Sequence, residues 1–415
     1  MRVTYRFAET PEFADVRLTV ENRGRRLKLG VSGRGSLRLR PYLVAYSLWL
    51  NTVGPIEVGD EATPNIYSLY LPPIPSHALA RQIEGDFRSW VLKRPTPLAL
   101  TIAVTDRCQC SCPHCSAAGT GGTAPVLSGE QIRRTVAEAV ALGVNVVTFT
   151  GGEPLLRDDL EECIAAVAPK KAVTLVFTNG LLLDGERARS LKAAGLHGVH
   201  VSLDSPDPDE HDKLRGRGGC FAAVAAAAQT ALAAGLKVGI STYATNESVR
   251  QHRLAGIAAL AAEWGAHEVT VFDAISTGRL FGRRDVHLTA AAHRDLVAQG
   301  KELTARHRAR PRVVTQAWTN SGRGFARLIG CLAANFQVHV TAHGDLTPCD
   351  FTPLSFGNVR DVPVAELWRR LTTHPAFCAR SKTCRMQDAA FRERYIDTIP
   401  TGATLPFPIT ELADR

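Results

Sequence analysis

The fold is decided by the stretch Asp106-Arg107-Cys108-Gln109-Cys110-Ser111-Cys112-Pro113-His114-Cys115. Within it, Cys108, Cys112 and Cys115 follow the spacing C-x3-C-x2-C. Three thiolates hold three corners of a [4Fe–4S] cluster and leave one iron open to another ligand. A structural zinc site usually presents four protein ligands. The spacing therefore indicates a cluster at which a substrate or cofactor can coordinate.

The composition is that of a globular protein with room for two or three domains. The chain has 415 residues, of which 45% are hydrophobic and 21% are charged. Its longest strongly apolar run, Tyr42–Leu50, is about half of a membrane span. Arg2 and Arg6 interrupt the start, so no signal peptide is predicted. We therefore expect a cytoplasmic location, which suits thiolates that must stay reduced.

Positive charge is concentrated at the start of the chain. Of the formal net charge of +9, residues 1–40 contribute +6, from ten Lys or Arg and four acids. A solvated basic surface is the simplest interpretation. The alternative is a surface for an anionic partner, such as an acidic electron carrier, a charged substrate or a lipid headgroup. Basic and aromatic residues do not interleave, which argues against a nucleic-acid partner.

The middle of the chain alternates β-rich apolar runs with amphipathic segments. The predicted strands are Leu98–Val104, Val144–Thr148, Val173–Phe177, Gly198–Leu203, Lys237–Thr242 and Glu268–Phe272. Helices are predicted between them, starting at a capping box formed by Ser128 and Gln131. A closed eight-unit barrel needs roughly 250 residues, so these units predict a partial, open one. The fold class is therefore α/β, a partial (β/α)6 barrel with a parallel sheet.

The candidate motifs fall just after predicted strands. Gly151-Gly152-Glu153-Pro154 follows the second strand, Thr178-Asn179-Gly180 the third, and Ser202-Leu203-Asp204 ends the fourth. Active sites of parallel α/β sheets form at the carboxyl ends of the strands. We therefore expect these motifs to gather around the cysteine loop.

Three parts are expected. Residues 1–96 would form a small, basic N-terminal accessory domain, 97–320 the partial barrel, and 321–415 a loop-rich domain. The last part contains a second group of cysteines at 331, 349, 378 and 384. Clustering of this kind favours metal ligation over disulfides.

Taken together, these motifs resemble those of radical S-adenosylmethionine enzymes, and the last part resembles a SPASM/twitch auxiliary-cluster domain. The resemblance spans residues 98–395. It implies that the open iron chelates the amino and carboxylate groups of S-adenosylmethionine. Reductive cleavage would then give methionine and a 5′-deoxyadenosyl radical, which removes hydrogen from an unactivated C–H bond. The cofactors perform this step, and the protein supplies placement and exclusion of side reactions.

The resemblance also assigns cofactor-binding residues. Glu153 would accept hydrogen bonds from the methionine ammonium, and Ser202 and Arg215 would hold the ribose or carboxylate. A guanidinium suits a carboxylate because it binds in a bidentate way, so this role of Arg215 is favoured over its alternative, a surface ion pair. Asn179 is an open case, because Asn-Gly is a common turn pair. The full set is Gly151, Gly152, Glu153, Pro154, Asn179, Ser202 and Arg215.

The metal ligands implied by the resemblance fall into two groups. Cys108, Cys112 and Cys115 would bind the S-adenosylmethionine cluster. A full SPASM pattern has seven cysteines, so the four of the second group imply one auxiliary [4Fe–4S] cluster, with zinc as the alternative. These ligands are Cys331 and Cys349, which frame Gly344 as C-x12-G-x4-C, then Cys378 and Cys384.

Several other residues are interpreted as structural. Cys110, inside the triad loop, is read as a bystander thiol, and Cys163 and Cys220 as buried inert thiols. His114 stands where the family often has an aromatic residue, and an imidazole can still stack near adenine. No catalytic acid, base or radical relay is assigned, although Asp273, Tyr243 and Asp350 lie near site-facing positions.

The leading hypothesis is a radical S-adenosylmethionine oxidoreductase or maturase acting on a small-molecule biosynthetic substrate. The alternative is a peptide-modifying (RiPP-type) maturase, in which the basic N-terminal part would bind a leader peptide. A lipid substrate ranks third, on the run Tyr42–Leu50. A non-catalytic iron–sulfur or zinc protein would explain the cysteines but not Gly151–Pro154. Every enzymatic hypothesis requires a reductant, for which a flavodoxin- or ferredoxin-like carrier is expected.

Overall fold

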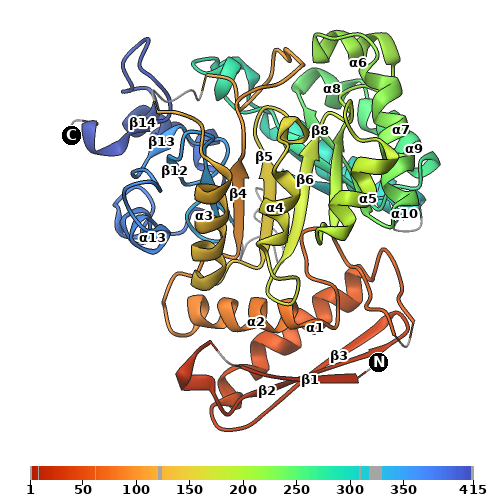
Figure 1. Cartoon of the computed structure of the whole chain (residues 1–415), viewed down its shortest axis with the longest axis vertical. Helices are drawn as coiled ribbons and strands as arrows, with labels where there is room; N and C mark the ends of the chain where they lie inside the picture. The colour runs from red at the N-terminus through yellow and green to blue at the C-terminus, as the bar shows by residue number, and fades with distance from the viewer. Residues whose placement is uncertain are drawn as a thin grey trace.

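A computed structural model describes residues 2–7, 9–60, 62–119, 124–307, 310–316 and 330–412 of the chain. It shows a central sheet with a small domain beneath its lower edge and a third part beside it (Figure 1). The expected boundary between residues 320 and 321 lies outside the described residues. Within the described residues, no helix has both the length and the apolar character needed to cross a bilayer.

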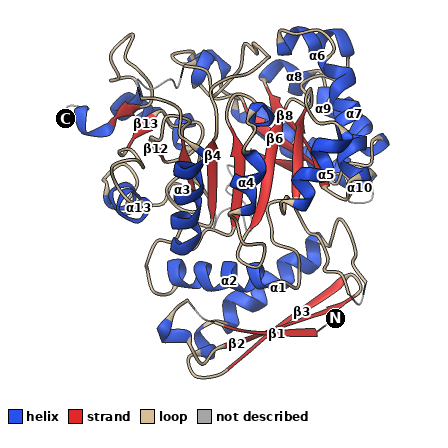
Figure 2. Cartoon of the chain, in the orientation of Figure 1, coloured by secondary structure: helices blue, strands red, loops and turns tan. Residues whose placement is uncertain are grey.

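The central sheet contains all six predicted strands, each paired in parallel with the next (Figure 2). Its order is β10-β9-β8-β7-β6-β5-β4-β11-β12, so the prediction of a parallel partial barrel is confirmed. Two strands beyond the prediction, β10 and β11, extend it in parallel at either side. The bounds are β4 (Ala99–Ala103), β5 (Val146–Thr150), β6 (Val173–Thr178), β7 (Gly198–Ser202), β8 (Lys237–Ala244), β9 (Glu268–Asp273), β10 (Arg312–Thr315), β11 (Gln337–Val340) and β12 (Leu346–Thr347).

Helices cover the outer face of this sheet, which explains why its strands are rich in buried Val, Ile and Leu. The helix after β4 begins at the Ser128–Gln131 capping box and places Ile132, Val136 and Val140 in the core. The covering helices are α3 (Gly129–Leu142), α4 (Leu160–Ala165), α5 (Gly185–Ala193), α6 (Pro208–Arg215), α7 (Cys220–Ala233), α8 (Asn246–Arg250), α9 (Arg253–Glu263) and α10 (Ala290–Arg306).

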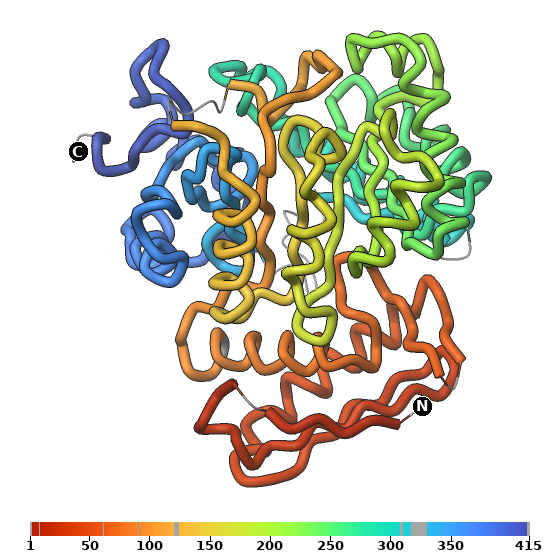
Figure 3. Tube along the Cα trace, viewed as in Figure 1, coloured from red at the N-terminus to blue at the C-terminus, as the bar shows by residue number. Residues whose placement is uncertain are grey.

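The N-terminal part is an antiparallel sheet with two helices. Strands β1 (Arg2–Arg6), β2 (Arg17–Arg23) and β3 (Arg26–Ser32) pair in sequence order. The apolar run at Tyr42–Leu50 belongs to α1 (Arg40–Val53), which packs against β3 and buries Leu43, Tyr46 and Leu50. The second helix, α2 (His77–Trp90), lies between this sheet and the barrel (Figure 3).

The segment that links α1 to α2 closes the amino end of the barrel. Ile56, Ile66 and Leu69 pack against Val146 and Val173, the first residues of β5 and β6. An apolar seal of this kind excludes water from the lower end of the strands. Reactants must therefore reach the barrel interior from the carboxyl ends.

The C-terminal part is attached to the barrel through the sheet itself. After β11, which pairs with β4, it contains β13 (Leu354–Ser355), α13 (Val364–Thr373), α14 (Ala389–Phe391) and β14 (Phe407–Pro408). Helix α13 packs against α3, and β13 pairs with β14. This part forms the blue region beside β4 in Figure 1.

The seal beneath the barrel depends on Arg312, so we expect substitution of this residue to lower the stability of the fold. Its buried guanidinium donates hydrogen bonds to the carbonyl oxygens of Tyr67, Val53 (3.0 Å) and Gly54 (2.6 Å). We expect Arg312→Met to lower the free energy of unfolding by about 3 kcal/mol, because it strands buried acceptors. Denaturant titration measures this loss. The exposed Arg306→Met should change stability by less than about 0.5 kcal/mol, and an equally small effect at Arg312 would contradict the seal.

The same seal predicts a loss of stability in acid. Glu57 lies 2.7 Å from Lys237 and 2.8 Å from His267, and these contacts, His267 first, hold its pKa at about 2. The model-peptide value is 4.5, so the stabilisation is complete above that pH and disappears as the pH falls towards 2. The advantage of the parent over Glu57→Gln, about 1 kcal/mol or less for this part-exposed pair, should therefore shrink between pH 5 and pH 3. A pH-independent difference in unfolding free energy would contradict this assignment.

Candidate functional site

The cysteine loop leaves the carboxyl end of β4 and runs to α3 across the upper edge of the sheet (Figure 3). Within its described residues it contains no helix or strand, so its backbone groups need partners from other segments. The motifs expected to gather around it do so, and they hold it by its main chain.

The paired glycines after β5 support the first part of the loop. Gly152 N donates to Thr105 O at 2.7 Å, and Glu153 N donates to Arg107 O at 2.8 Å. A Cβ on Gly151 would stand 2.2 Å from Thr105 O, and one on Gly152 would stand 2.1 Å from Arg107 O. No side chain fits at either position, because the cysteine loop itself occupies the space.

The end of α6 supports the middle of the loop. Ser111 N donates to Arg215 O at 2.9 Å. At the next position, a Cβ on Gly216 would stand 2.2 Å from the Ser111 hydroxyl oxygen. Arg215 therefore serves the loop through its backbone as well as its side chain.

A third support, which sequence reasoning missed, comes from the segment after β9. Arg279 N donates to Cys115 O at 3.0 Å, and Arg279 Nη1 donates to Cys112 O at 2.8 Å. A Cβ on Gly278 would stand 2.1 Å from Cys115 O. Nothing in the local sequence marks these two residues, because their role depends on a contact with residues more than 160 positions earlier.

Glu153 is buried and joins two strand ends. Its Oε1 accepts hydrogen bonds from Leu155 N (3.1 Å) and Thr178 Oγ1 (2.8 Å), and its Oε2 accepts one from Asn179 N (2.8 Å). Burial is the largest influence and raises the pKa of this carboxyl to about 7, although the hydrogen bonds oppose it. Oε2 retains capacity for one further donor. Pro154 follows as the first residue of a short 3-10 helix, Pro154–Leu156.

Arg215 belongs to a buried ionic network beside the triad. Its Nη2 lies 2.9 Å from Asp204 Oδ2, and its Nη1 lies 3.8 Å from Cys112 Sγ. Asp204 Oδ2 also lies 3.1 Å from His114 Nε2, and His114 stacks on Tyr243 with ring centroids 3.8 Å apart. Burial alone would raise the pKa of Asp204, but Arg215 and His114 hold it at about 2. This network places a positive charge next to the cysteine sulfur.

The other two predicted cofactor residues lie at strand ends nearby. Asn179 Nδ2 lies 3.2 Å from Gln109 Oε1 and 3.9 Å from Cys108 Sγ, while its Oδ1 accepts a hydrogen bond from Leu181 N at 3.0 Å. It therefore both forms the turn and contacts the cysteine loop. Ser202, the last residue of β7, accepts a hydrogen bond from the Ser241 hydroxyl at 3.1 Å.

The triad sulfurs differ in exposure. Cys108 is exposed, Cys115 is intermediate and Cys112 is buried. A hydrogen bond with Cys110 lowers the pKa of Cys108, whereas burial raises that of Cys112. Among the described residues, no three His, Cys, Asp or Glu side chains stand close enough to hold a single metal ion. Three thiols on a loop with a fixed backbone fit the three-ligand binding of a [4Fe–4S] cluster.

The second cysteine group brings three of its four members together. Cys331 and Cys384 share a hydrogen bond that lowers the pKa of Cys331 and raises that of Cys384. Burial raises the pKa of Cys349 to about 12. The charge of Cys331 also raises the pKa of Cys349, and the charge of Cys349 raises the pKa of Cys384. Cys378 is exposed, and its sulfur lies 3.7 Å from Pro375 O. Cys384 is buried, whereas Cys331 and Cys349 are half-buried, and these three thiols suit a further iron–sulfur cluster.

Polar contacts join the auxiliary part to the end of β9. Asp273 Oδ2 accepts hydrogen bonds from Gln387 Nε2 (2.8 Å) and lies 3.0 Å from His293 Nε2 on α10. Gln387 stands three residues after Cys384. Asp350, directly after Cys349, pairs with His339 on β11 at 3.1 Å. Two of the site-facing acids considered from the sequence therefore have structural partners.

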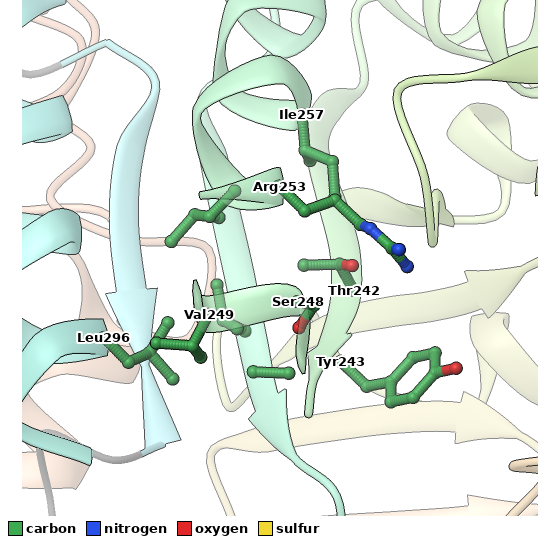
Figure 4. Close-up of a pocket in the computed structure, with 10 residues that line it drawn as sticks. Thr242, Tyr243, Ser248, Val249, Arg253, Ile257 and Leu296 are labelled. Carbon is green, nitrogen blue, oxygen red and sulfur yellow. The ribbon is translucent and has the colours of Figure 1, made fainter. Parts of the chain in front are cut away.

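A small pocket adjoins the triad network behind Tyr243 (Figure 4). The Tyr243 ring and the Arg253 guanidinium point to the same side, while Val249 and Leu296 lie at the opposite end. Arg253 also forms an ion pair with Glu210 at 2.6 Å. The pocket is lined mainly by apolar side chains between β8, α8, α9 and α10.

Comparison with known proteins identifies both cysteine regions. The sequence profile of the radical SAM superfamily matches residues 102–251, and that of the SPASM iron–sulfur cluster-binding domain matches residues 331–387. The AdoMet-dependent heme synthase of Nitratidesulfovibrio vulgaris is 28% identical over 66% of this chain and 80% of its own length. The PqqA peptide cyclase of Xanthomonas campestris pv. campestris is 28% identical over 66% of this chain and 74% of its own.

The fold is also found in solved structures. SuiB of Streptococcus suis, bound to its precursor peptide SuiA, aligns with a TM-score of 0.57 and 16% identity, covering 89% of this chain and 88% of SuiB. The matched domains bind [4Fe–4S] clusters and S-adenosylmethionine. The chain thus contains a radical SAM superfamily domain at residues 102–251, followed by a SPASM iron–sulfur cluster-binding domain at residues 331–387.

Proposed function

We propose that this enzyme reductively cleaves S-adenosylmethionine and abstracts hydrogen from an unactivated C–H bond of a small-molecule biosynthetic substrate. The observation that carries the proposal is the cysteine loop, held by its backbone at the carboxyl ends of parallel strands. When bound, the reduced cluster supplies the electron that breaks the sulfonium bond, and the resulting 5′-deoxyadenosyl radical takes the hydrogen.

The chain's own residues position these groups. Cys108, Cys112 and Cys115 would hold the cluster, and the remaining acceptor capacity of Glu153 would receive the methionine ammonium. The guanidinium of Arg215 lies 3.8 Å from Cys112 Sγ. It would give up part of its ion pair with Asp204 and donate hydrogen bonds to the methionine carboxylate instead. Cys331, Cys349 and Cys384 would hold the auxiliary cluster, with the exposed Cys378 as its fourth ligand.

The closed amino end of the barrel supports substrate entry at the carboxyl ends of the strands. Because residues 56–69 seal the amino end, a small molecule would enter from the carboxyl ends, where the triad loop lies. The heme synthase relative, matched over 66% of this chain, is named for a small-molecule product. This supports ranking a small molecule ahead of a peptide as the substrate.

A peptide substrate is the second candidate, favoured by one observation. The SuiB alignment covers 89% of this chain, so it includes much of the N-terminal part. In that part, β1 and β3 are the edge strands of the described sheet. A peptide would add to such an edge through main-chain hydrogen bonds, and basic side chains on these strands would favour an acidic segment.

The proposal includes an electron donor and a compartment. The basic surface of residues 1–40 would receive an acidic flavodoxin- or ferredoxin-like carrier. We place the enzyme in the cytoplasm, because thiols that ligate a cluster must stay reduced.

The proposed reaction is tested by anaerobic reconstitution with iron and sulfide, followed by S-adenosylmethionine and dithionite. The parent should form 5′-deoxyadenosine, and Cys112→Ala should lose at least about 100-fold in rate because a cluster ligand is gone. The matched control is Cys163→Ala, which removes a buried thiol on α4 and should keep the parent rate. Equal rates in Cys112→Ala and the parent would reject the proposal.

Iron content separates the enzyme from a structural metal protein. We expect about eight irons per chain in the reconstituted parent, corresponding to two cubane clusters. Cys384→Ala should lower the iron content by about four while leaving the triad cluster in place. Two zincs per chain and no iron would instead support the non-catalytic alternative.

The two substrate classes are separated by exchange and isotope transfer. Transfer of deuterium from a labelled small molecule into 5′-deoxyadenosine supports the small-molecule substrate. Slower amide exchange of β1 or β3 when a candidate precursor peptide is added, with deuterium transfer from that peptide, supports the second.

A further inference from the structure

Two cysteines outside both ligand groups lie in contact beside the triad. Cys110 Sγ and Cys220 Sγ are 3.8 Å apart, although 110 positions separate them in the sequence. Cys110 belongs to the cysteine loop, and Cys220 is the first residue of α7. Neither belongs to the ligand pattern of the family.

The position of Cys220 is fixed by its surroundings. Asp212 accepts hydrogen bonds from Gly219 N (2.5 Å) and Phe221 N (2.8 Å), the residues on either side of Cys220. Gly219 has a φ of +82°, which favours glycine at this turn. The Cys220 side chain is itself fully buried.

Cys110 stands between Cys220 and a cluster ligand. Its amide donates to Cys108 Sγ at 3.4 Å, and the two thiols share a hydrogen bond. In the cluster-free chain, Cys110 therefore has two sulfurs within reach. Pairing with Cys108 would consume a ligand, whereas pairing with Cys220 would leave the triad intact.

We propose that Cys110 and Cys220 form a reversible disulfide in the cluster-free chain, and that this bond keeps Cys110 from forming a disulfide with Cys108. A disulfide requires a sulfur separation of about 2.05 Å, so the pair must approach by roughly 1.8 Å, which a small side-chain rotation provides. Ser111, the residue after Cys110, already donates its amide to Arg215 O, so the bond would add a second link between the cysteine loop and the segment from α6 to α7.

The oxidant is a low-molecular-weight disulfide, and the reaction is thiol–disulfide exchange. Cys110, the more accessible of the two, attacks the small disulfide and releases one small thiol. Cys220 then attacks the mixed disulfide at Cys110 and releases the second small thiol. Two protein thiols are oxidised, one small disulfide is reduced to two thiols, and the reverse exchange restores Cys110 and Cys220.

The test uses the full-length, cluster-free protein, because disulfide formation requires no turnover. The reduced protein is exposed to glutathione disulfide in native buffer, its remaining thiols are alkylated, and its peptides are analysed by mass spectrometry. We expect a 110–220 cross-linked peptide pair, lighter by two hydrogens than the free peptides, with Cys108, Cys112 and Cys115 alkylated.

Two variants complete the experiment. Cys220→Ser should leave Cys110 joined to glutathione or to Cys108, and should take up less iron than the parent when both are reconstituted after oxidation without a thiol reductant. Cys163→Ser, which removes another buried thiol, should behave as the parent. Absence of the 110–220 link in the parent overturns the proposal, whether the thiols stay reduced or pair otherwise. Equal iron uptake by Cys220→Ser and the parent overturns the protective role.

The inference rests on the ligand role of Cys108 but not on the substrate. Loss of 5′-deoxyadenosine formation with an intact 110–220 link would reject the proposed reaction alone. Normal 5′-deoxyadenosine formation without the link would reject the disulfide alone.

Discussion

The site depends on one constraint, the main-chain support of a loop that has no helix or strand of its own in its described part. Three segments distant in sequence supply it: the glycine pair after β5, the end of α6 and Arg279 after β9. Each support includes a glycine whose Cβ would collide with the loop. The sulfurs are thereby placed through peptide groups, which leaves the thiols available for a metal.

A second constraint operates at the other end of the barrel. A parallel sheet with an open lower end would admit water to the buried polar side chains inside it, among them Glu268 and Arg312. The segment between α1 and α2 prevents this by packing apolar residues against the strand starts and accepting the hydrogen bonds of Arg312. The N-terminal part therefore contributes to the barrel's structure whatever it binds.

The sequence predicted what depends on local pattern and missed what depends on long-range contact. All six strands were found because short, β-rich and largely apolar runs alternate with amphipathic helical segments. The motif around Glu153 was placed correctly at a strand end, yet the reason for its glycines, collision with Thr105 and Arg107, is visible only in three dimensions. The local sequence does not indicate that Arg279 contacts the cysteine loop, because an arginine in an irregular segment is usually predicted to be a surface residue. The predicted burial of Cys220 is confirmed, but spacing alone says nothing about its contact with Cys110, 110 residues away.

The SPASM domain contacts the barrel through residues that lie next to its cysteines. Phe351, two residues after Cys349, meets Phe272 of β9 with ring centroids 6.0 Å apart. Gln387, three residues after Cys384, donates to Asp273 at the end of the same strand. Because β11 also pairs with β4, the domain is fixed at both margins of the barrel. The turns that carry Cys349 and Cys384 are thus also the turns that contact β9.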